Sequence, residues 1–227
     1  MNSLVSQWYE EKRNVEEMRG WNPALKAWER EVITHFPSGA RLLDIGCGLG
    51  REAFPLYESG FDVVGTDISQ EVITQVRQLS AEKGYDIPFL VCDGRKLPLP
   101  DDSFDAVLIW AQTFGLLYGE EYKKDVLAEC RRVLKPGGLF SFSAHDVEYL
   151  KARYPHCVDG RRFYPYAGAQ IYWEAFEASE LTQTARQAGF EVIRCEQGSI
   201  YKPEDGTILH CLCRKQQSGK ENQTGGI

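Results

Sequence analysis

A nine-residue stretch with three closely spaced glycines most constrains what this chain can fold into. Residues 42–50 read Leu-Leu-Asp-Ile-Gly-Cys-Gly-Leu-Gly, so that a short apolar run ends in a carboxylate and breaks into glycines two positions apart. A helical pattern follows directly. Glycine lets the backbone approach a ligand where a Cβ atom would collide, and a helix N-terminus offers unpaired N–H groups. The stretch therefore predicts a strand, a tight turn and a helix start, the arrangement of a nucleotide-binding turn.

The spacing of these glycines distinguishes between two kinds of nucleotide-binding turn. The dinucleotide fingerprint is G-x-G-x-x-G, whereas Gly46, Gly48 and Gly50 give G-x-G-x-G and Arg51 stands at the third glycine position of the fingerprint. With Asp44 just before the turn, the stretch resembles the first motif, D-x-G-C/T-G-x-G, of class I S-adenosylmethionine (SAM) methyltransferases. The resemblance implies SAM as the cofactor. Here it implies cofactor contacts from Asp44, Gly46, Cys47, Gly48, Gly50 and Arg51.

Length, charge and cysteine usage indicate which cellular compartment and which classes of partner to expect. The chain has 227 residues, enough for one domain with a substantial core, and its net charge of −7 argues against a nucleic-acid binder with a basic face. No apolar run is long enough to span a membrane and the N-terminus lacks a signal-peptide core, so we expect a cytoplasmic protein. The seven cysteines are scattered, mostly inside apolar runs, which predicts reduced, buried thiols rather than a disulfide framework.

Strand-like and helix-like patterns alternate along most of the chain. Two N-terminal helices, one with apolar residues at helical spacing from Leu4 to Met18 and a second that Asn22 can cap, are expected to cap the cofactor cleft. Strands are then predicted over residues 40–44, 61–67, 88–92, 104–110 and 139–144. Helices are predicted between them over residues 51–59, 69–84 and 119–134. This βα alternation indicates a parallel sheet with helices on both faces. A last helix capped by Ser179 precedes strands over 190–197 and 207–214, whose connection is too short for a crossover and predicts an antiparallel hairpin.

The expected fold is an α/β domain with a doubly wound, seven-stranded, mostly parallel sheet that ends in the antiparallel hairpin. The methyltransferase resemblance implies the same Rossmann-like architecture. We expect a single domain over residues 1–215, with an N-terminal helical cap over residues 1–37. Residues 146–173 lack a clear period and are interpreted as a substrate-side insertion. The polar tail over residues 216–227 is expected to be disordered.

Polar residues end the predicted strands, where a doubly wound sheet binds ligands. Asp67 lies 21 positions after Gly46, at the end of the second strand, where a carboxylate accepts hydrogen bonds from ribose hydroxyls. Asp93 ends the third strand, and the resemblance implies that it binds the adenine amino group while the following N–H meets a ring nitrogen. Simple turn or capping roles are the alternative for both aspartates. The resemblance extends the cofactor contacts to Ile68, Gly94, Arg95, Trp110 and Ala111.

Two further motifs resemble a subgroup that methylates small metabolites such as quinone precursors and sterols. Residues 97–107, Leu-Pro-Leu-Pro-Asp-Asp-Ser-Phe-Asp-Ala-Val, are similar to the subgroup's LPFPDNSFDAV. Residues 131–138, Arg-Arg-Val-Leu-Lys-Pro-Gly-Gly, match its RVLKPGG and are expected to shape a turn rather than to touch the substrate. The resemblance covers residues 40–142 well and implies a small-molecule methyl acceptor.

Methyl transfer from a sulfonium needs chiefly an acceptor held in line with the methyl group, and some acceptors also need a base. His145, just past the fifth strand, is the base candidate, although a structural role is the common alternative for a lone histidine. Aromatic residues near the predicted cleft mouth are candidates to bind a flat substrate or to stabilise a cation, with lid packing as their alternative. The substrate candidates are Gln112, Tyr118, Tyr149, Tyr164 and Trp173, with Tyr166 and Tyr172 in the same cluster.

Two other functions remain open. A SAM-binding sensor or scaffold without catalysis would carry the same motifs, and an NAD(P)-dependent oxidoreductase shares the nucleotide turn but not its glycine spacing. A metal site is not expected: Cys211 and Cys213 share one strand face whereas His210 points away, so core packing is the better interpretation. The fourth strand ends in Trp110-Ala111-Gln112. Nucleic-acid amino methyltransferases carry D/N-P-P-Y/F at this place, and its absence here argues against a base-methylating role.

Overall fold

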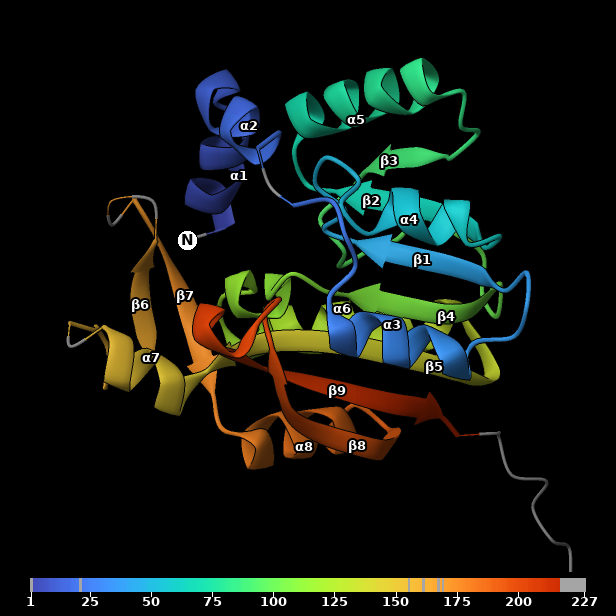
Figure 1. Ribbon diagram of the computed structural model, residues 1–227. Helices are drawn as coiled ribbons and strands as arrows, with labels where there is room; N and C mark the ends of the chain where they lie inside the picture. The colour runs from blue at the N-terminus through green and yellow to red at the C-terminus, as the bar shows by residue number, and fades with distance from the viewer. Residues whose placement is uncertain are drawn as a thin grey trace, which may run out of the picture.

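The computed structural model describes residues 2–20, 22–154, 156–160, 162–166, 168 and 170–216. In this part of the chain one twisted sheet carries helices on both faces (Figure 1). The strands are β1 (Arg41–Ile45), β2 (Asp62–Asp67), β3 (Phe89–Val91), β4 (Phe104–Ile109), β5 (Leu134–Asp146), β6 (Phe163–Tyr166), β7 (Ile171–Phe176), β8 (Phe190–Ser199) and β9 (Thr207–Lys215). The helices are α1 (Asn2–Glu10), α2 (Lys12–Met18), α3 (Ala27–Val32), α4 (Ala53–Glu58), α5 (Gln70–Lys83), α6 (Glu120–Val133), α7 (Val147–Arg153) and α8 (Ala178–Gln187), with short 3-10 turns η1 (Ile33–His35), η2 (Thr113–Leu116) and η3 (Pro203–Asp205).

The seven strands expected from the sequence lie in the order β3-β2-β1-β4-β5-β9-β8. The first five are mutually parallel, and β9 runs antiparallel to both β5 and β8. The predicted mostly parallel α/β sheet with a closing antiparallel hairpin is thereby confirmed. Strand order reverses between β1 and β4, so the carboxyl ends of these two strands are the place where a ligand is expected.

Side chains alternate between two apolar cores because successive strand residues face opposite sides of the sheet. Leu42 of β1 packs with α3, α4 and α5 on one face, and Leu43 packs with α6 and α8 on the other. Both residues have no exposed surface. Burial on both faces explains why these strands are near-continuous apolar runs in the sequence.

The region without a clear period in the sequence forms α7 and an additional antiparallel hairpin, β6–β7. β7 pairs in parallel with the last two residues of β5, His145 and Asp146, beyond the point where β4 ends. Figure 1 shows the hairpin standing at the edge of the sheet, opposite α5. It therefore forms a wall beside the carboxyl ends of the strands.

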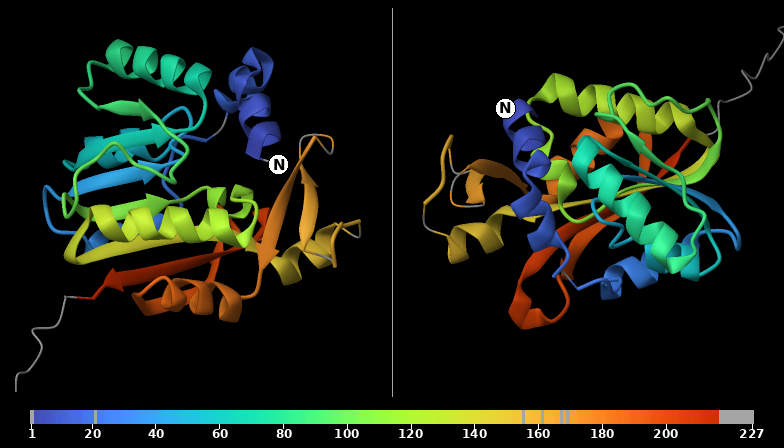
Figure 2. Two further views of the ribbon diagram at one scale, coloured as in Figure 1. Left: turned by 180° about the vertical axis from the view of Figure 1, so that it is seen from behind. Right: turned by 90° about the horizontal axis from the view of Figure 1, so that it is seen from above.

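The N-terminal helices begin and end at other residues than the sequence pattern indicates. The single helix expected up to Met18 is broken at Glu11, where the Asn14 side chain donates a hydrogen bond to the Trp8 carbonyl (2.8 Å) and so competes with the helix ladder. Asn22 does not cap the second helix; its side chain closes a local turn on Ala24, and α3 begins later at Ala27. Seen from above in Figure 2, α1 and α2 lie between β6–β7 and α5.

Two other local predictions need correction. Ser179 does not cap α8, because the N-cap residue is Glu177, two positions earlier, which forms a capping box with Glu180. The segment after α6 enters β5 directly at Leu134 and its Pro-Gly-Gly forms an irregularity in the strand, so that Leu134 pairs with Phe104 and Leu139 with Ala106. The extra residues bulge out of the ladder rather than ending it.

The two motifs that resemble the metabolite-methylating subgroup, residues 97–107 and 131–138, contact each other in the structure. Arg132 donates to the carbonyl groups of Leu97 and Leu99 at 3.0 and 2.9 Å, and Lys135 pairs with Asp105 at 2.7 Å. These contacts tie the proline-rich loop before β4 to the end of α6. Residues 131–138 therefore stabilise the local structure through Arg132 and Lys135.

The structure corrects the expectation that all cysteines are reduced. Cys195 of β8 and Cys211 of β9 are opposite each other in the antiparallel ladder and form a disulfide. Periodicity within one strand carries no information about its cross-strand partner, which is why the pair was missed. The tail prediction falls on residues outside the described part of the chain, apart from Gln216. Among the described helices, none is long and apolar enough to cross a membrane.

Candidate functional site

A cavity of about 510 Å³ lies at the carboxyl ends of the strands, at the reversal of strand order. Its lining includes the glycine turn, the ends of β2 and β3, α1 and α2 from above, and Tyr166 and Trp173 of β6–β7. Of the predicted site residues, those in its lining are Gly46, Cys47, Gly48, Gly50, Arg51, Asp67, Ile68, Asp93, Ala111 and Trp173. The fold thus brings together residues that are up to 127 positions apart in the sequence, from Gly46 to Trp173.

The glycine turn has a backbone that other residues rarely adopt. Gly46, Gly48 and Gly50 all have positive φ, at 76°, 51° and 85°. A Cβ atom on Gly46 would lie 2.6 Å from a side-chain carbon of Thr113, and one on Gly50 would lie 2.8 Å from the Phe54 ring. Glycine is therefore required here both by dihedral angle and by space.

Asp67 is joined to this turn. The Gly48 N–H donates to Asp67 Oδ2 (3.1 Å) and the Ser69 N–H donates to Oδ1 (3.0 Å), which fixes the carboxylate in the cavity wall. Burial raises its pKa, although the backbone N–H groups of Ser69, Gly48 and Ile68 oppose that shift. A carboxylate held rigidly against the turn is suited to accept hydrogen bonds from a diol.

Asp93, at the end of β3, is partly open to solvent and is held by its neighbour. The Arg95 guanidinium binds Asp93 Oδ2 at 2.6 and 3.0 Å, and the Arg95 N–H donates to Oδ1 (3.0 Å). The Tyr122 hydroxyl donates to the Asp93 carbonyl (2.6 Å), and the Arg95 guanidinium lies over the Tyr122 ring. Gly94 is buried and Arg95 exposed, and neither lines the cavity.

A buried ionic cluster beneath the turn escaped the sequence analysis. Arg51 binds Glu29 Oε1 (2.6 Å) and also pairs with Glu52, while Lys26 Nζ lies 3.5 Å from the same Glu29 oxygen. All four side chains are nearly or wholly buried. Glu29 and Lys26 come from the N-terminal helical cap, so the cluster fastens this cap to the glycine turn. No local pattern marks them, since an acidic residue in a first helical turn is ordinary.

Asp44 adjoins this cluster and carries an unsatisfied group. Its side chain is 1 % exposed and its Oδ2 has no hydrogen-bond partner in the described structure. Burial raises the pKa of Asp44 well above its usual value, and the neighbouring carboxylate of Glu52 raises it further. Asp44 is not among the residues that line the cavity, so its contact with the cofactor stays a prediction.

The residues after β4 divide between the core and the cavity. Trp110 is buried, donates its indole N–H to Ser141 Oγ (2.8 Å) and packs edge-to-face on Trp28, so it belongs to the core. Ala111 lines the cavity. Ala111 and Gln112 both have positive φ, at 50° and 61°, and the Gln112 side chain lies outside the cavity lining.

His145 is buried behind the cavity wall. It packs against Trp173 with ring centroids 4.3 Å apart, its Nε2 has no partner among the described residues, and it is not part of the cavity lining. Burial lowers its pKa to about 3, helped by the nearby Lys26 charge. The imidazole is therefore neutral at physiological pH and a weak base, and this geometry gives no support to a general-base role.

The aromatic candidates separate in the same way. Trp173 lines the cavity, whereas the side chains of Tyr118, Tyr149 and Tyr164 lie outside its lining. Tyr118 stacks on Phe163 with centroids 5.5 Å apart, and the Tyr149 hydroxyl donates to the Asp205 carbonyl (3.4 Å). Their proposed substrate contacts stay predictions.

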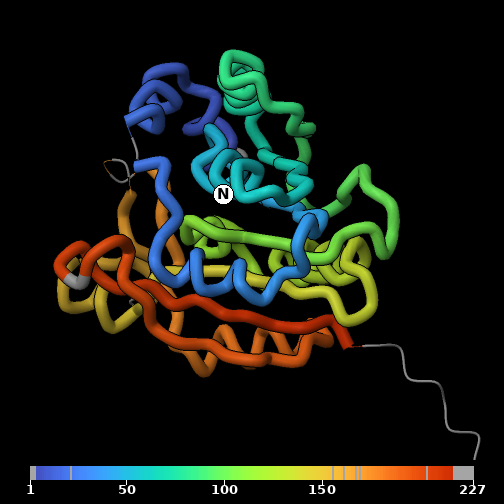
Figure 3. Tube along the Cα trace, turned by 45° about the vertical axis from the view of Figure 1, so that its right-hand side comes forward, coloured from blue at the N-terminus to red at the C-terminus, as the bar shows by residue number. Residues whose placement is uncertain are grey.

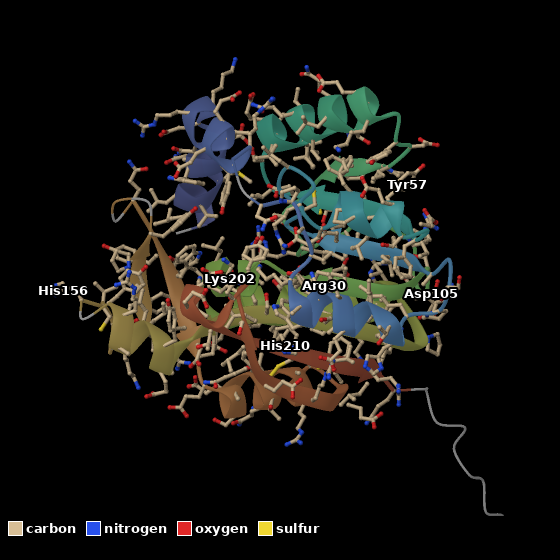
Figure 4. All side chains as sticks on the ribbon, in the orientation of Figure 1. Arg30, Tyr57, Asp105, His156, Lys202 and His210 are labelled. Atoms are coloured by element: carbon tan, nitrogen blue, oxygen red, sulfur yellow. A yellow bond between two sulfur atoms is a disulfide. The ribbon has the colours of Figure 1, made fainter. Side chains whose placement is uncertain are left out.

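The strand β9 offers no metal site. His210, labelled in Figure 4, stacks on Trp28 with ring centroids 4.7 Å apart, and Cys211 is in the disulfide. Among the described residues, no group of three or more His, Cys, Asp or Glu side chains is arranged to hold a metal ion.

The comparisons with known proteins agree with this geometry. Residues 42–138 match the family model described as "Methyltransferase domain". This segment, 97 of the 227 residues, is similar to methyltransferase domains. It runs from the first strand through the glycine turn, both aspartates and the motif after α6, so the resemblance to class I methyltransferases expected from the motifs is confirmed.

Curated relatives match this domain. The demethylmenaquinone methyltransferase of Renibacterium salmoninarum is 38 % identical over 115 residues, 50 % of this chain and 45 % of the relative. The ubiquinone/menaquinone biosynthesis C-methyltransferase of Burkholderia mallei is 37 % identical over 122 residues, 50 % of this chain and 47 % of the relative. The chain spans about half the length of the curated relatives it matches.

Solved structures share the fold over nearly the whole chain. A Burkholderia thailandensis 1,6-didemethyltoxoflavin-N1-methyltransferase, with bound 1,6-didemethyltoxoflavin and S-adenosylhomocysteine, superposes with a TM-score of 0.70 at 22 % identity, covering 95 % of this chain and 87 % of the other. The [4+2]-cyclase SpnF superposes with a TM-score of 0.69 at 20 % identity, covering 96 % and 97 %. The methyltransferase domain therefore sits in a fold that these proteins share along their length.

Proposed function

We propose that this chain transfers a methyl group from SAM to a small-molecule acceptor. The observation that carries the proposal is the meeting, in one cavity, of the G-x-G-x-G turn with the carboxylates of Asp67 and Asp93 beside the buried Asp44. Bound SAM supplies a methyl group activated by a positively charged sulfonium, whose transfer is an in-line displacement. The matched domain and the relatives named as methyltransferases support the proposal.

The residues present fit SAM. Asp67 accepts hydrogen bonds from the ribose hydroxyls, and Asp93 binds the adenine amino group; Gly94 is not in the cavity lining, so its contact with adenine stays a prediction from the resemblance. The three glycines of the turn carry no Cβ atom, so a ligand can approach the backbone of residues 46–50 closely. Asp44, with its free oxygen, offers a negative charge to the methionyl side. The protein's own part in the reaction is to hold these groups and to exclude water, since His145 supplies no strong base.

Calorimetry with S-adenosylhomocysteine, the demethylated cofactor, tests the first half of the proposal. We expect binding at micromolar strength, and a loss of at least tenfold in affinity for Asp67→Ala, because this change removes the acceptor of the ribose hydroxyls. Asp62→Ala, at the other end of β2 and exposed, is the matched control and keeps the affinity of the unmodified protein. A protein that binds NADH in preference to S-adenosylhomocysteine would contradict the proposal.

A SAM-binding protein without methyl transfer is the second candidate. It is favoured by the position of His145 outside the cavity and by the structural similarity to SpnF, which is named as a cyclase. Turnover of methyl-labelled SAM with a metabolite library separates the two: labelled product supports methyl transfer, whereas tight binding without any labelled product supports the sensor or scaffold. A cytoplasmic location, a lack of nucleic-acid binding and the single domain over residues 1–215 stay predictions from the sequence.

A further inference from the structure

Two tyrosines from elements outside the matched segment line the same cavity. Tyr9 comes from α1 and Tyr166 from β6, and both line the cavity. Neither hydroxyl has a hydrogen-bond partner among the described residues. Both rings pack on Trp8, with centroids 4.7 Å away for Tyr9 and 5.3 Å away for Tyr166, so the two side chains lie on the same side of the cavity. Burial raises the pKa of Tyr9, and Tyr166 and Asp67 raise it further. A pair of unpartnered phenols beside Asp67 therefore faces the space next to the cofactor site.

The walls around these phenols are flat and apolar. The centroid of the Tyr166 ring lies 3.9 Å from that of Trp173 and 5.3 Å from that of Trp8. The aromatic side chains of α1, β6 and β7 therefore form one surface. Val5 and Leu116 complete this part of the lining. Such a surface suits a planar ring, which it contacts through offset or edge-to-face packing.

This part of the cavity offers no charge to an ionised acceptor. Its described lining residues from α1, η2, β6 and β7 include neither a cation nor a carboxylate. The cations that line the cavity lie on other elements and are occupied: Arg51 is in the ionic cluster and Arg19 binds Glu16 and Gln75. Lys83, at the far end of α5, packs over the rings of Phe54 and Tyr85. Burial also raises the pKa of Tyr166 to about 12, so both phenols are neutral at physiological pH.

We propose that Tyr9 and Tyr166 form the polar anchor of the acceptor subsite, and that the acceptor is a neutral, planar ring carrying a hydroxyl or carbonyl oxygen. The inference rests on the proposed function, because it takes the cofactor to occupy the turn and the aspartates. Each phenol both donates and accepts a hydrogen bond, so the pair holds one ring oxygen while Trp173 packs on the ring face. Both tyrosines lie outside residues 42–138, which assigns acceptor choice to the part of the chain that the family model leaves uncovered.

Three naphthalene probes test the inference on protein saturated with S-adenosylhomocysteine. They are 2-naphthol, 2-methylnaphthalene and 2-naphthoate, which share the ring and differ in carrying a hydroxyl, no polar atom or a negative charge. Equilibrium dialysis gives the dissociation constant of each. We expect 2-naphthol to bind about tenfold more tightly than 2-methylnaphthalene, as two neutral hydrogen bonds provide, and 2-naphthoate to bind most weakly.

The Tyr9→Phe/Tyr166→Phe double variant should bind 2-naphthol and 2-methylnaphthalene within about twofold of each other, with the affinity for 2-methylnaphthalene and for S-adenosylhomocysteine unchanged. Tyr154→Phe, an exposed tyrosine after α7, is the control and keeps the tenfold preference. The two single variants, each expected to lose part of the preference, serve if the double variant does not fold.

Tighter binding of 2-naphthoate, or a 2-naphthol preference that survives in the double variant, would overturn the inference. A fall in S-adenosylhomocysteine affinity with an intact 2-naphthol preference would also overturn it, because the phenols would then serve the cofactor. Failure of the unmodified protein to bind S-adenosylhomocysteine refutes the proposed function instead. The calorimetric titration that precedes dialysis records this outcome separately.

Discussion

At the scale of single residues, the two carboxylates on either side of the glycine turn have different surroundings. Asp67 is satisfied by the backbone N–H groups of Gly48 and Ser69, whereas Asp44 keeps an oxygen without a partner in the described structure. Asp44 also lies beside Glu52, so its charged form is disfavoured both by burial and by a like charge. Such a group costs stability in the free protein and becomes favourable only with a cationic ligand.

Asp44→Asn should therefore stabilise the ligand-free protein and weaken cofactor binding. A carboxyl whose folded pKa is raised loses stability as pH rises from its unfolded value near 3.9 through the folded value, so its removal helps at neutral pH. We expect Tm to rise by about 2–4 °C, the effect of about 1 kcal/mol in a chain of this size, with tenfold or weaker S-adenosylhomocysteine binding. Asp105→Asn is the control and should lower Tm, because the ion pair with Lys135 lowers the pKa of Asp105 and the charged carboxylate is the favoured form. A lower Tm for Asp44→Asn would contradict this account.

At the scale of elements, α1 is fastened to the start of α5. The Glu10 carboxylate accepts the Gln70 N–H (2.7 Å), and the Ser69 hydroxyl donates to the Tyr9 carbonyl (3.0 Å). The bond to Glu10 satisfies a first-turn N–H group of α5, and the bond from Ser69 ties the N-cap residue of α5 to α1. Figure 3 shows α1 and α2 beside α5, and residues 22–26 lead down to α3. The N-terminal helices are thus joined both to α5 and, through Glu29, to the glycine turn.

Glu10→Ala should loosen α1 and α2 without unfolding the sheet. Loss of a helix-capping carboxylate costs about 1 kcal/mol, and we expect amide hydrogen exchange to accelerate severalfold in α1, α2 and the first turn of α5. Amides of β1 and β4 should keep their rates. Glu121→Ala, an exposed acidic residue in the first turn of α6, is the matched control. Equal acceleration in the central strands would show that Glu10 supports the whole fold instead.

At the scale of the whole molecule, the buried His145 makes stability depend on pH. Its pKa is about 3 in the folded chain and near 6.5 when unfolded, so the unfolded chain binds more protons between these values. Stability is then fully present above pH 6.5 and falls as the pH drops toward 3. One histidine at the junction of β5 and β7 thus links the wall of the cavity to acid unfolding.

His145→Gln should reduce the loss of stability between pH 7 and pH 5. The expected contribution of His145 to that loss is about 2 kcal/mol, from the 1.5 units between pH 5 and an unfolded pKa near 6.5. Urea unfolding at the two pH values measures it, and the comparison is the difference between them rather than the stability at pH 7. His35→Gln, on the exposed η1, should leave the difference unchanged. An equal loss of stability between pH 7 and pH 5 in His145→Gln and His35→Gln would contradict the claim that burial of His145 causes the pH dependence.

What the sequence by itself determined is local or periodic. The positive φ values of the turn are encoded by Gly46, Gly48 and Gly50, the cap of α5 by Ser69, and the sheet by alternating βα patterns. Asp67 and Asp93 each come at the end of an apolar strand. Because the strands are parallel, their carboxyl ends lie at the same edge of the sheet. For these reasons the fold, and the cavity residues that we propose to hold the cofactor, follow from the order of residues along the chain.

Only the tertiary structure decided what depends on partners far apart in the sequence. No pattern near Glu29 indicates Arg51, none near Cys195 indicates Cys211, and none near Tyr9 indicates Tyr166. The pairing of β7 with the end of β5 sets the wall that carries Tyr166 and Trp173, and it removes His145 from the cavity. The acceptor subsite that we propose depends on tertiary structure because its residues come from three separate elements, α1, β6 and β7. Their packing against one another is not encoded in any sequence period.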